Sequence, residues 1–178
     1  MSNIFRQYDI RGIVGEELSE QMVYDIARAF AAYAIRKDQN TILLGRDNRE
    51  SSPGISKIMI EALVSSGCNV IDLGMVITPV FYYAARYLNI QAGIMITASH
   101  NPAEYNGCKL LLGDSTIYGE QIQDIKHIID SQNYFTGPRG SVKTLDINDA
   151  YARMIGEKVS LKRKLKIVVD CGNGTASL

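Results

Sequence analysis

The sequence predicts an α/β protein: a layered α/β/α domain with a largely parallel, mixed sheet, followed by the start of a second α/β domain. Short apolar runs that are typical of buried strands alternate with longer segments whose apolar residues recur at helical spacing. A chain of 178 residues is long enough for one such domain and the beginning of another. Apolar residues make up 46% of the chain and charged residues 21%, which is the composition of a folded protein.

Each expected element has its own local signal. In residues 18–37 the apolar side chains fall on one helical face, and Ser19 can cap that helix. Turn residues and proline bound the other segments. Further helices are expected over residues 51–66, 78–88, 119–130 and 147–159, and strands over residues 41–45, 69–73, 92–97, 108–112 and 165–170. The turn-rich stretch 131–145 suggests a boundary between a first domain, residues 1–145, and a truncated second one, residues 146–178.

Composition also excludes several classes of function. Lys plus Arg equals Asp plus Glu at 19 each, so no global charge favours nucleic acid or an anionic membrane. The longest apolar run, residues 29–35, is far shorter than the roughly 20 residues of a membrane-spanning helix. The first residues lack the apolar stretch of a signal peptide, which predicts a cytoplasmic protein. Three widely spaced cysteines indicate buried thiols rather than disulfides or a zinc site.

The densest group of polar residues follows the expected strand 92–97. In open α/β sheets, ligands bind beyond the carboxyl ends of the strands, where this loop lies. Its chemistry-bearing residues are Ser99, His100, Asn101, Glu104 and, just after it, Lys109. A Ser-His hydrolase is disfavoured, because adjacent side chains on extended backbone point apart and no nucleophile-elbow glycines surround the serine. A plain polar turn between strands is the alternative reading of this loop.

Two weaker signals lie elsewhere. Asp47, Asp72 and Asp114 sit near strand ends but lack the close spacing of a calcium loop, so caps and turns are the expected roles. Gly172 and Gly174 after a strand resemble the opening of a dinucleotide fingerprint, but a third glycine and the helix are missing.

The polar loop also carries a longer pattern. The run TASHNP at residues 97–102, followed by YNGCK at 105–109, resembles the phosphoserine signature of the α-D-phosphohexomutases. Three further stretches resemble that family in the expected order: FRQYDIRG at 5–12, GRDNR at 45–49 and VDCGNG at 169–174. The stretch YDIRG resembles the phosphomannomutase/phosphoglucomutase branch more than phosphoglucosamine mutases.

The resemblance implies reversible phosphoryl transfer between the 1- and 6-hydroxyls of a hexose, through a hexose 1,6-bisphosphate that reorients in the site. Ser99 would carry the phosphoryl group, and its phosphate would supply one ligand to Mg²⁺. Lys109 and Arg11 match positions beside that phosphoserine, where cations would neutralise about −1.5 to −2 charges. His100 would orient groups or exchange protons, and Tyr8 would contact the phosphosugar substrate.

Some family features are not found in these residues. The family's Asp-Gly-Asp-Gly-Asp magnesium loop, its sugar-selecting loop and its late phosphate-gripping loop would all follow residue 178. We therefore expect a catalytically inert N-terminal fragment whose partners are the C-terminal domains of the same protein, with sugar preference set there. The competing hypotheses are a stand-alone sugar-phosphate-binding module without catalysis and, more weakly, a dinucleotide-binding domain built on the Gly172 turn.

Overall fold

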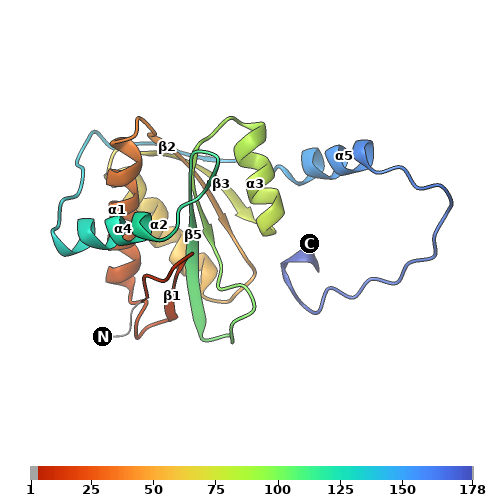
Figure 1. The fold of residues 1–178 in the computed structure, drawn as a ribbon, viewed down its shortest axis with the longest axis horizontal. Coiled ribbons are helices and arrows are strands. Elements are labelled where there is room, and N and C mark those ends of the chain that lie inside the picture. The colour runs from red at the N-terminus through yellow and green to blue at the C-terminus, as the bar shows by residue number, and fades with distance from the viewer. Residues whose placement is uncertain (1–3, 178) are drawn as a thin grey trace.

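A computed structural model describes residues 4–177 as a three-layered arrangement around one mixed sheet (Figure 1). The strands are β1 (Ile10–Ile13), β2 (Thr41–Arg46), β3 (Asn69–Met75), β4 (Ala92–Ile96), β5 (Tyr105–Leu112), β6 (Ser115–Thr116) and β7 (Val142–Thr144). The helices are α1 (Glu20–Ile35), α2 (Ser52–Ser65), α3 (Thr78–Tyr87), α4 (Glu120–Asp130) and α5 (Asn148–Lys158), with a 3₁₀ turn at Thr175–Ser177.

The strand order in the sheet is β1-β5-β4-β2-β3-β7, and β6 pairs with β5. The central pairs β4-β2, β2-β3 and β3-β7 are parallel, whereas β5 runs antiparallel to both β4 and β1. The sheet is therefore mixed, with the parallel centre that the alternation of strands and helices predicts. Because β4 and β5 are antiparallel neighbours, a short loop can join them, and this loop contains the candidate serine.

The central strands are buried on both faces because side chains alternate across the sheet. In β2, Ile42 and Leu44 face the core beneath α1, α2 and α4, and Leu43 faces the core beneath α3. Helices α1, α2 and α4 lie together on one side of the sheet, and α3 lies on the other (Figure 1). Every residue of β4 is buried. This double coverage leaves the strand ends and their loops as the exposed parts of the sheet.

The serines at the starts of α1 and α2 play different roles. Ser19 caps α1 as expected, since its hydroxyl accepts a hydrogen bond from the Met22 N–H at 3.2 Å. Ser51 and Pro53 stand at the start of α2, but the Ser51 hydroxyl caps no N–H group of that helix. It accepts a hydrogen bond from Asn106 instead. The Ser51 hydroxyl thus takes part in a tertiary contact and not in a helix cap.

The expected strand over residues 165–170 is not formed. These residues adopt neither helix nor strand, and Val168 is 98% exposed. A strand needs a neighbour to pair its backbone N–H and C=O groups, and no segment among residues 4–177 pairs with this one. The stretch 131–145 contains β7, which pairs with β3 and was not expected. Beyond β7, α5 packs on α3, and Ile147 is buried with that helix.

No helix in the described residues is long and apolar enough to cross a membrane.

Candidate active site around Ser99

Ser99 lies on the exposed loop that follows β4, in a backbone conformation that residues other than glycine rarely adopt. Its φ is 57°, in the left-handed region, which costs about 1 kcal/mol for a residue with a Cβ atom. The Ser99 N–H donates to the hydroxyl oxygen of Thr97 at 2.9 Å, which holds the turn. The Ser99 hydroxyl lies 3.3 Å from Nδ1 of His100. The loop therefore presents a serine hydroxyl to solvent with an imidazole beside it.

The guanidinium of Arg49, from the loop after β2, holds this turn in place. Asp47 pairs with it, with 3.4 Å between Oδ2 and Nε. Its two terminal nitrogens donate hydrogen bonds, between 2.6 and 3.0 Å, to four main-chain carbonyl oxygens of the loop, those of Ser99, Asn101, Pro102 and Tyr105. Only the planar, forked guanidinium has enough donors in a fixed geometry to do this. Arg49 thus fixes the path of the loop through its backbone.

A second basic cluster comes from β1 and β5. Arg11 pairs with the carboxylate of Asp9 and donates to the side-chain oxygen of Asn101, in the serine loop. Lys109 Nζ lies 4.0 Å from Asp9 Oδ2. Asp9 is buried, with 8% of its surface exposed. One buried carboxylate therefore orients two cations, and one of these cations contacts the loop that carries Ser99.

Close backbone approach brings β1 to this position. Arg11 lies opposite Gly107 in the β1-β5 register. A Cβ atom at Gly107 would stand 2.1 Å from the Ile10 carbonyl oxygen, so only glycine fits there. Next to it, burial raises the pKa of the Cys108 thiol to about 12, with the Asp9 carboxylate adding to the shift. This thiol stays protonated and belongs to the core rather than to the chemistry.

Beneath the loop, Asn106 is fully buried and satisfies its amide in three directions. It donates to Ser51 and Ser52 at 2.8 and 3.0 Å, and its oxygen accepts from the Gly107 N–H at 2.8 Å. The Ser52 hydroxyl donates in turn to Asp47 at 2.5 Å. This network joins the start of α2 to β5 and to the carboxylate that pairs with Arg49.

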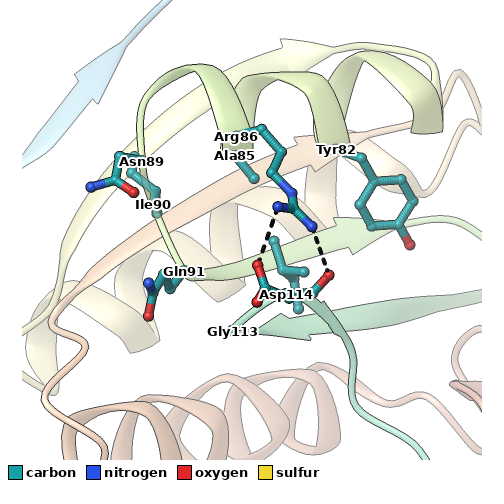
Figure 2. Close-up of a pocket in the computed structure, with 9 residues that line it drawn as sticks. Tyr82, Ala85, Arg86, Asn89, Ile90, Gln91, Gly113 and Asp114 are labelled. Atoms are coloured by element: carbon teal, nitrogen blue, oxygen red, sulfur yellow. Dashed lines mark hydrogen bonds and ion pairs between the residues drawn. The ribbon is translucent and has the colours of Figure 1, made fainter.

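A hollow of about 350 Å³ opens beside the serine. Ser99 and Thr97 line one part of it, the start of α3 lines another, and Asn48 and Thr175 line a third. Figure 2 shows a different hollow, of about 330 Å³, where Arg86 and Asp114 form an exposed ion pair. Its wall includes residues just before β4 and just after β5, at the opposite edge of the sheet from Ser99. The Figure 2 hollow is therefore separate from the serine site.

The structure thus brings together part of the residues that the sequence singles out. Ser99 and His100 are in contact, and Arg11 and Lys109 meet at Asp9. Tyr8 is 66% exposed on the segment before β1. Arg49, Asp9 and Asn106 were not predicted as site residues, although all three lie inside the quoted motifs. Of the acidic residues expected to cap and turn, Asp47 accepts from the Arg49 N–H and Asp72 from the Gly74 N–H.

Comparisons with known proteins show what this chain is similar to. Residues 2–136 match the family model described as phosphoglucomutase/phosphomannomutase, alpha/beta/alpha domain I. The chain belongs to the phosphoglucomutase/phosphomannomutase family. It is 42% identical over 177 residues to a phosphomannomutase/phosphoglucomutase of Pseudomonas aeruginosa, covering 99% of this chain. It is also 43% identical over 173 residues to a phosphoglucomutase of Neisseria meningitidis, covering 97% of this chain.

A solved structure extends the similarity to three dimensions. A phosphoglucomutase/phosphomannomutase family protein from Burkholderia thailandensis superposes with a TM-score of 0.92 at 37% identity, over 98% of this chain and 40% of its own. The chain spans 38% of the length of both the Pseudomonas and the Neisseria relatives. The α/β/α fold of this family member is therefore shown.

The described residues also bear on the metal that the family resemblance implies. Across residues 4–177, no group of three or more His, Cys, Asp or Glu side chains is placed to hold a metal ion. The carboxylates of the two basic clusters are already engaged, Asp9 by Arg11 and Lys109 and Asp47 by Arg49 and Ser52. These residues by themselves do not form a Mg²⁺ site.

Proposed function

We propose that this chain is the phosphoserine-carrying part of a phosphohexomutase, which interconverts hexose 1-phosphates and hexose 6-phosphates of glucose and mannose. The observation that carries the proposal is the geometry of Ser99, whose hydroxyl is exposed and faces an imidazole while its backbone is held by Arg49. A surface turn without a function would not need a left-handed serine held by an arginine with four main-chain bonds. The names of the relatives support the same reaction class.

The proposed chemistry is an exchange between two oxygen atoms. In the first step a hydroxyl of the hexose phosphate attacks the phosphorus on Ser99, the bond from phosphorus to Oγ breaks, and a bond to the sugar oxygen forms. The sugar hydroxyl gives up its proton and Oγ gains one, so the step produces free serine and a hexose 1,6-bisphosphate. After the bisphosphate reorients, the reverse step returns its other phosphoryl group to Ser99. Atoms and charge balance over the cycle.

The residues near Ser99 suit a loose phosphoryl-transfer transition state, which is stabilised mainly by positioning and by positive charge. Lys109 and Arg11 supply the charge, and Asp9 fixes both in direction. His100 Nδ1, 3.3 Å from Oγ, can hold the proton that moves between the oxygens. Tyr8 is proposed to contact the sugar.

A phosphate on Ser99 would contribute a ligand to Mg²⁺, which neutralises charge during phosphoryl transfer. The other ligands are proposed to come from outside these 178 residues, in keeping with relatives of more than twice this length. The proposal also includes the sequence-based expectations of a cytoplasmic location and of C-terminal domains as partners. The isolated 178-residue chain is then expected to turn over no substrate.

The experiment is a Ser99→Ala substitution in the full-length protein, with conversion of glucose 1-phosphate and mannose 1-phosphate as the readout. The expected result is a loss of nearly all activity with an unchanged unfolding transition. The matched control is Ser115→Ala, on exposed β6, which should keep wild-type rates. Retained activity in the Ser99→Ala protein would remove this serine from the mechanism. Phosphosugar binding without turnover by the wild type would favour a binding module instead.

A further inference from the structure

The segment after α5 returns to the serine site, where two of its residues form hydrogen bonds with Asn48. The Asn48 N–H donates to the Thr175 hydroxyl at 3.2 Å, and that hydroxyl donates back to the Asn48 side-chain oxygen at 2.9 Å. The Asn48 amide nitrogen also donates to the Asn173 carbonyl at 2.8 Å. Two residues 127 positions apart are thus joined through both backbone and side chain.

Asn48 directly precedes Arg49, the residue that holds the serine loop. The Arg49 N–H donates to Asp47 at 3.1 Å, so the backbone leading into Arg49 is held by two consecutive N–H groups, that of Asn48 bonded to Thr175 and that of Arg49 bonded to Asp47. The side chain of Arg49 then fixes four carbonyl oxygens of the loop, including that of Ser99 at 3.0 Å. A continuous set of hydrogen bonds therefore runs from Thr175 through Asn48 and Arg49 to Ser99.

The same residues share the wall of one hollow. Asn48, Arg49, Ser99 and Thr175 all line the space of about 350 Å³ beside the serine. A shift of the 172–175 turn would change both the shape of this hollow and the support of Arg49. Phosphoryl transfer depends on placing the reacting oxygens correctly, and misplacement by about 1 Å can cost about a hundredfold in rate.

We propose that Thr175, acting through Asn48, is a positioning residue for Ser99. The docked 172–175 turn fixes the position of Arg49, and Arg49 fixes the position of the serine loop. The proposal rests on the function proposed above. The hydrogen bonds of Thr175 go to Asn48 and act on the placement of Ser99, so its effect should fall mainly on the chemical step and much less on substrate affinity. The reactivity of Ser99 thereby depends on the position of the segment after α5, whose 172–175 turn contacts Asn48.

The test is Thr175→Val in the full-length protein, which keeps the shape of the side chain and removes two of the three hydrogen bonds. We expect kcat for glucose 1-phosphate to fall about three- to tenfold, with KM changed by less than about twofold. Thr175→Ser, which restores the hydroxyl, should recover most of the loss. The matched control is Thr41→Val, at the opposite end of β2, which should keep wild-type kcat.

A double-substitution cycle tests whether the effect passes through Arg49. Arg49→Lys keeps the charge but cannot bond four carbonyls, and it should lower kcat by more than about tenfold. Adding Thr175→Val to it should lower kcat no further, because the connection is already broken. Losses that multiply in the double variant, or wild-type kcat for Thr175→Val, would overturn the proposal. If Arg49→Lys fails to fold, the Thr175→Val and Thr175→Ser pair still decides.

Ser99→Ala in the same assay separates the two proposals. An inactive Ser99→Ala protein beside a fully active Thr175→Val protein contradicts only the positioning role. An active Ser99→Ala protein contradicts the function itself.

Discussion

Arg49 binds Ser99 through the main chain, with 3.0 Å between its Nη2 and the Ser99 carbonyl oxygen, and leaves the serine hydroxyl to His100. The loop is therefore held rigidly while its reactive oxygen stays accessible. Side-chain hydrogen bonds to that oxygen from Arg49 would compete with a phosphoryl group, and the structure avoids them. The main-chain carbonyl of Ser99 holds the loop in place, and the side-chain hydroxyl of the same residue stays available for the reaction.

The buried amide of Asn106 should be important for stability. Asn106→Ala removes three hydrogen bonds and leaves the Gly107 N–H without its side-chain acceptor. We expect the free energy of unfolding to fall by about 1–3 kcal/mol. Urea denaturation of the 178-residue chain measures this change, with exposed Asn40→Ala as the matched control. Equal midpoints for the two variants would show that the buried network adds little.

Gly107 should tolerate no side chain, because its Cβ atom would lie 2.1 Å from the Ile10 carbonyl oxygen. Gly107→Ala must push β1 away from β5, and we expect a loss of about 1–3 kcal/mol in the free energy of unfolding. Gly156→Ala, in α5 with open space around it, is the matched control and should be neutral or slightly stabilising. Thermal unfolding of both variants checks this, and a Gly107→Ala protein as stable as wild type would contradict the register of β1.

The cysteines should differ in reactivity. Burial raises the pKa of the Cys68 thiol to about 11 and of the Cys108 thiol to about 12, whereas Cys171 is partly exposed. Iodoacetamide at pH 8 should therefore modify Cys171 in the folded chain, and all three thiols in denaturant. Rapid modification of Cys108 in the folded chain would show that the core beside β1 opens easily.

The same shift predicts the direction of a pH effect on stability. The Cys108 pKa rises from an ordinary value of 9.0 to about 12 on folding, so the folded chain keeps a proton that the unfolded chain releases in this range. The stabilising contribution is complete below pH 9 and is lost as the pH rises towards 12. Urea midpoints measured from pH 8 upward should fall, and Cys108→Val should reduce the slope. If the urea midpoint of the Cys108→Val variant falls with pH as steeply as that of the wild type, other groups cause the loss of stability at alkaline pH.

Sequence patterns predicted the central elements well because burial on both faces makes them strongly apolar. The strands β2, β3 and β4 and the helices α1 to α4 all lie within a few residues of their expected bounds. The short strands β1 and β7 were missed, since they carry little apolar signal and exist only because β5 and β3 pair with them. The prediction of a strand over residues 165–170 was wrong for the opposite reason. Its apolar pattern is strong, but no neighbouring strand among the described residues pairs with it.

The residue types alone left the site open, because a serine, a histidine and a lysine after a strand also suit a plain polar turn. The family resemblance singled out Ser99, Lys109 and Arg11, and the structure brings Ser99 and His100 into contact. The supporting residues could not be found in this way, because their contacts join distant parts of the sequence. Arg49 contacts Ser99, 50 positions away, and Asp9 contacts Lys109, 100 positions away. Only the fold makes such pairs neighbours.

The most direct test of the account is to find where the phosphoryl group goes. The full-length protein, first freed of phosphate, is incubated with glucose 1,6-bisphosphate, and its peptides are mapped by mass spectrometry. The account predicts one added phosphoryl group, on Ser99, and none in the Ser99→Ala protein. A phosphoryl group on another residue, or an active enzyme that never carries one on Ser99, would contradict it.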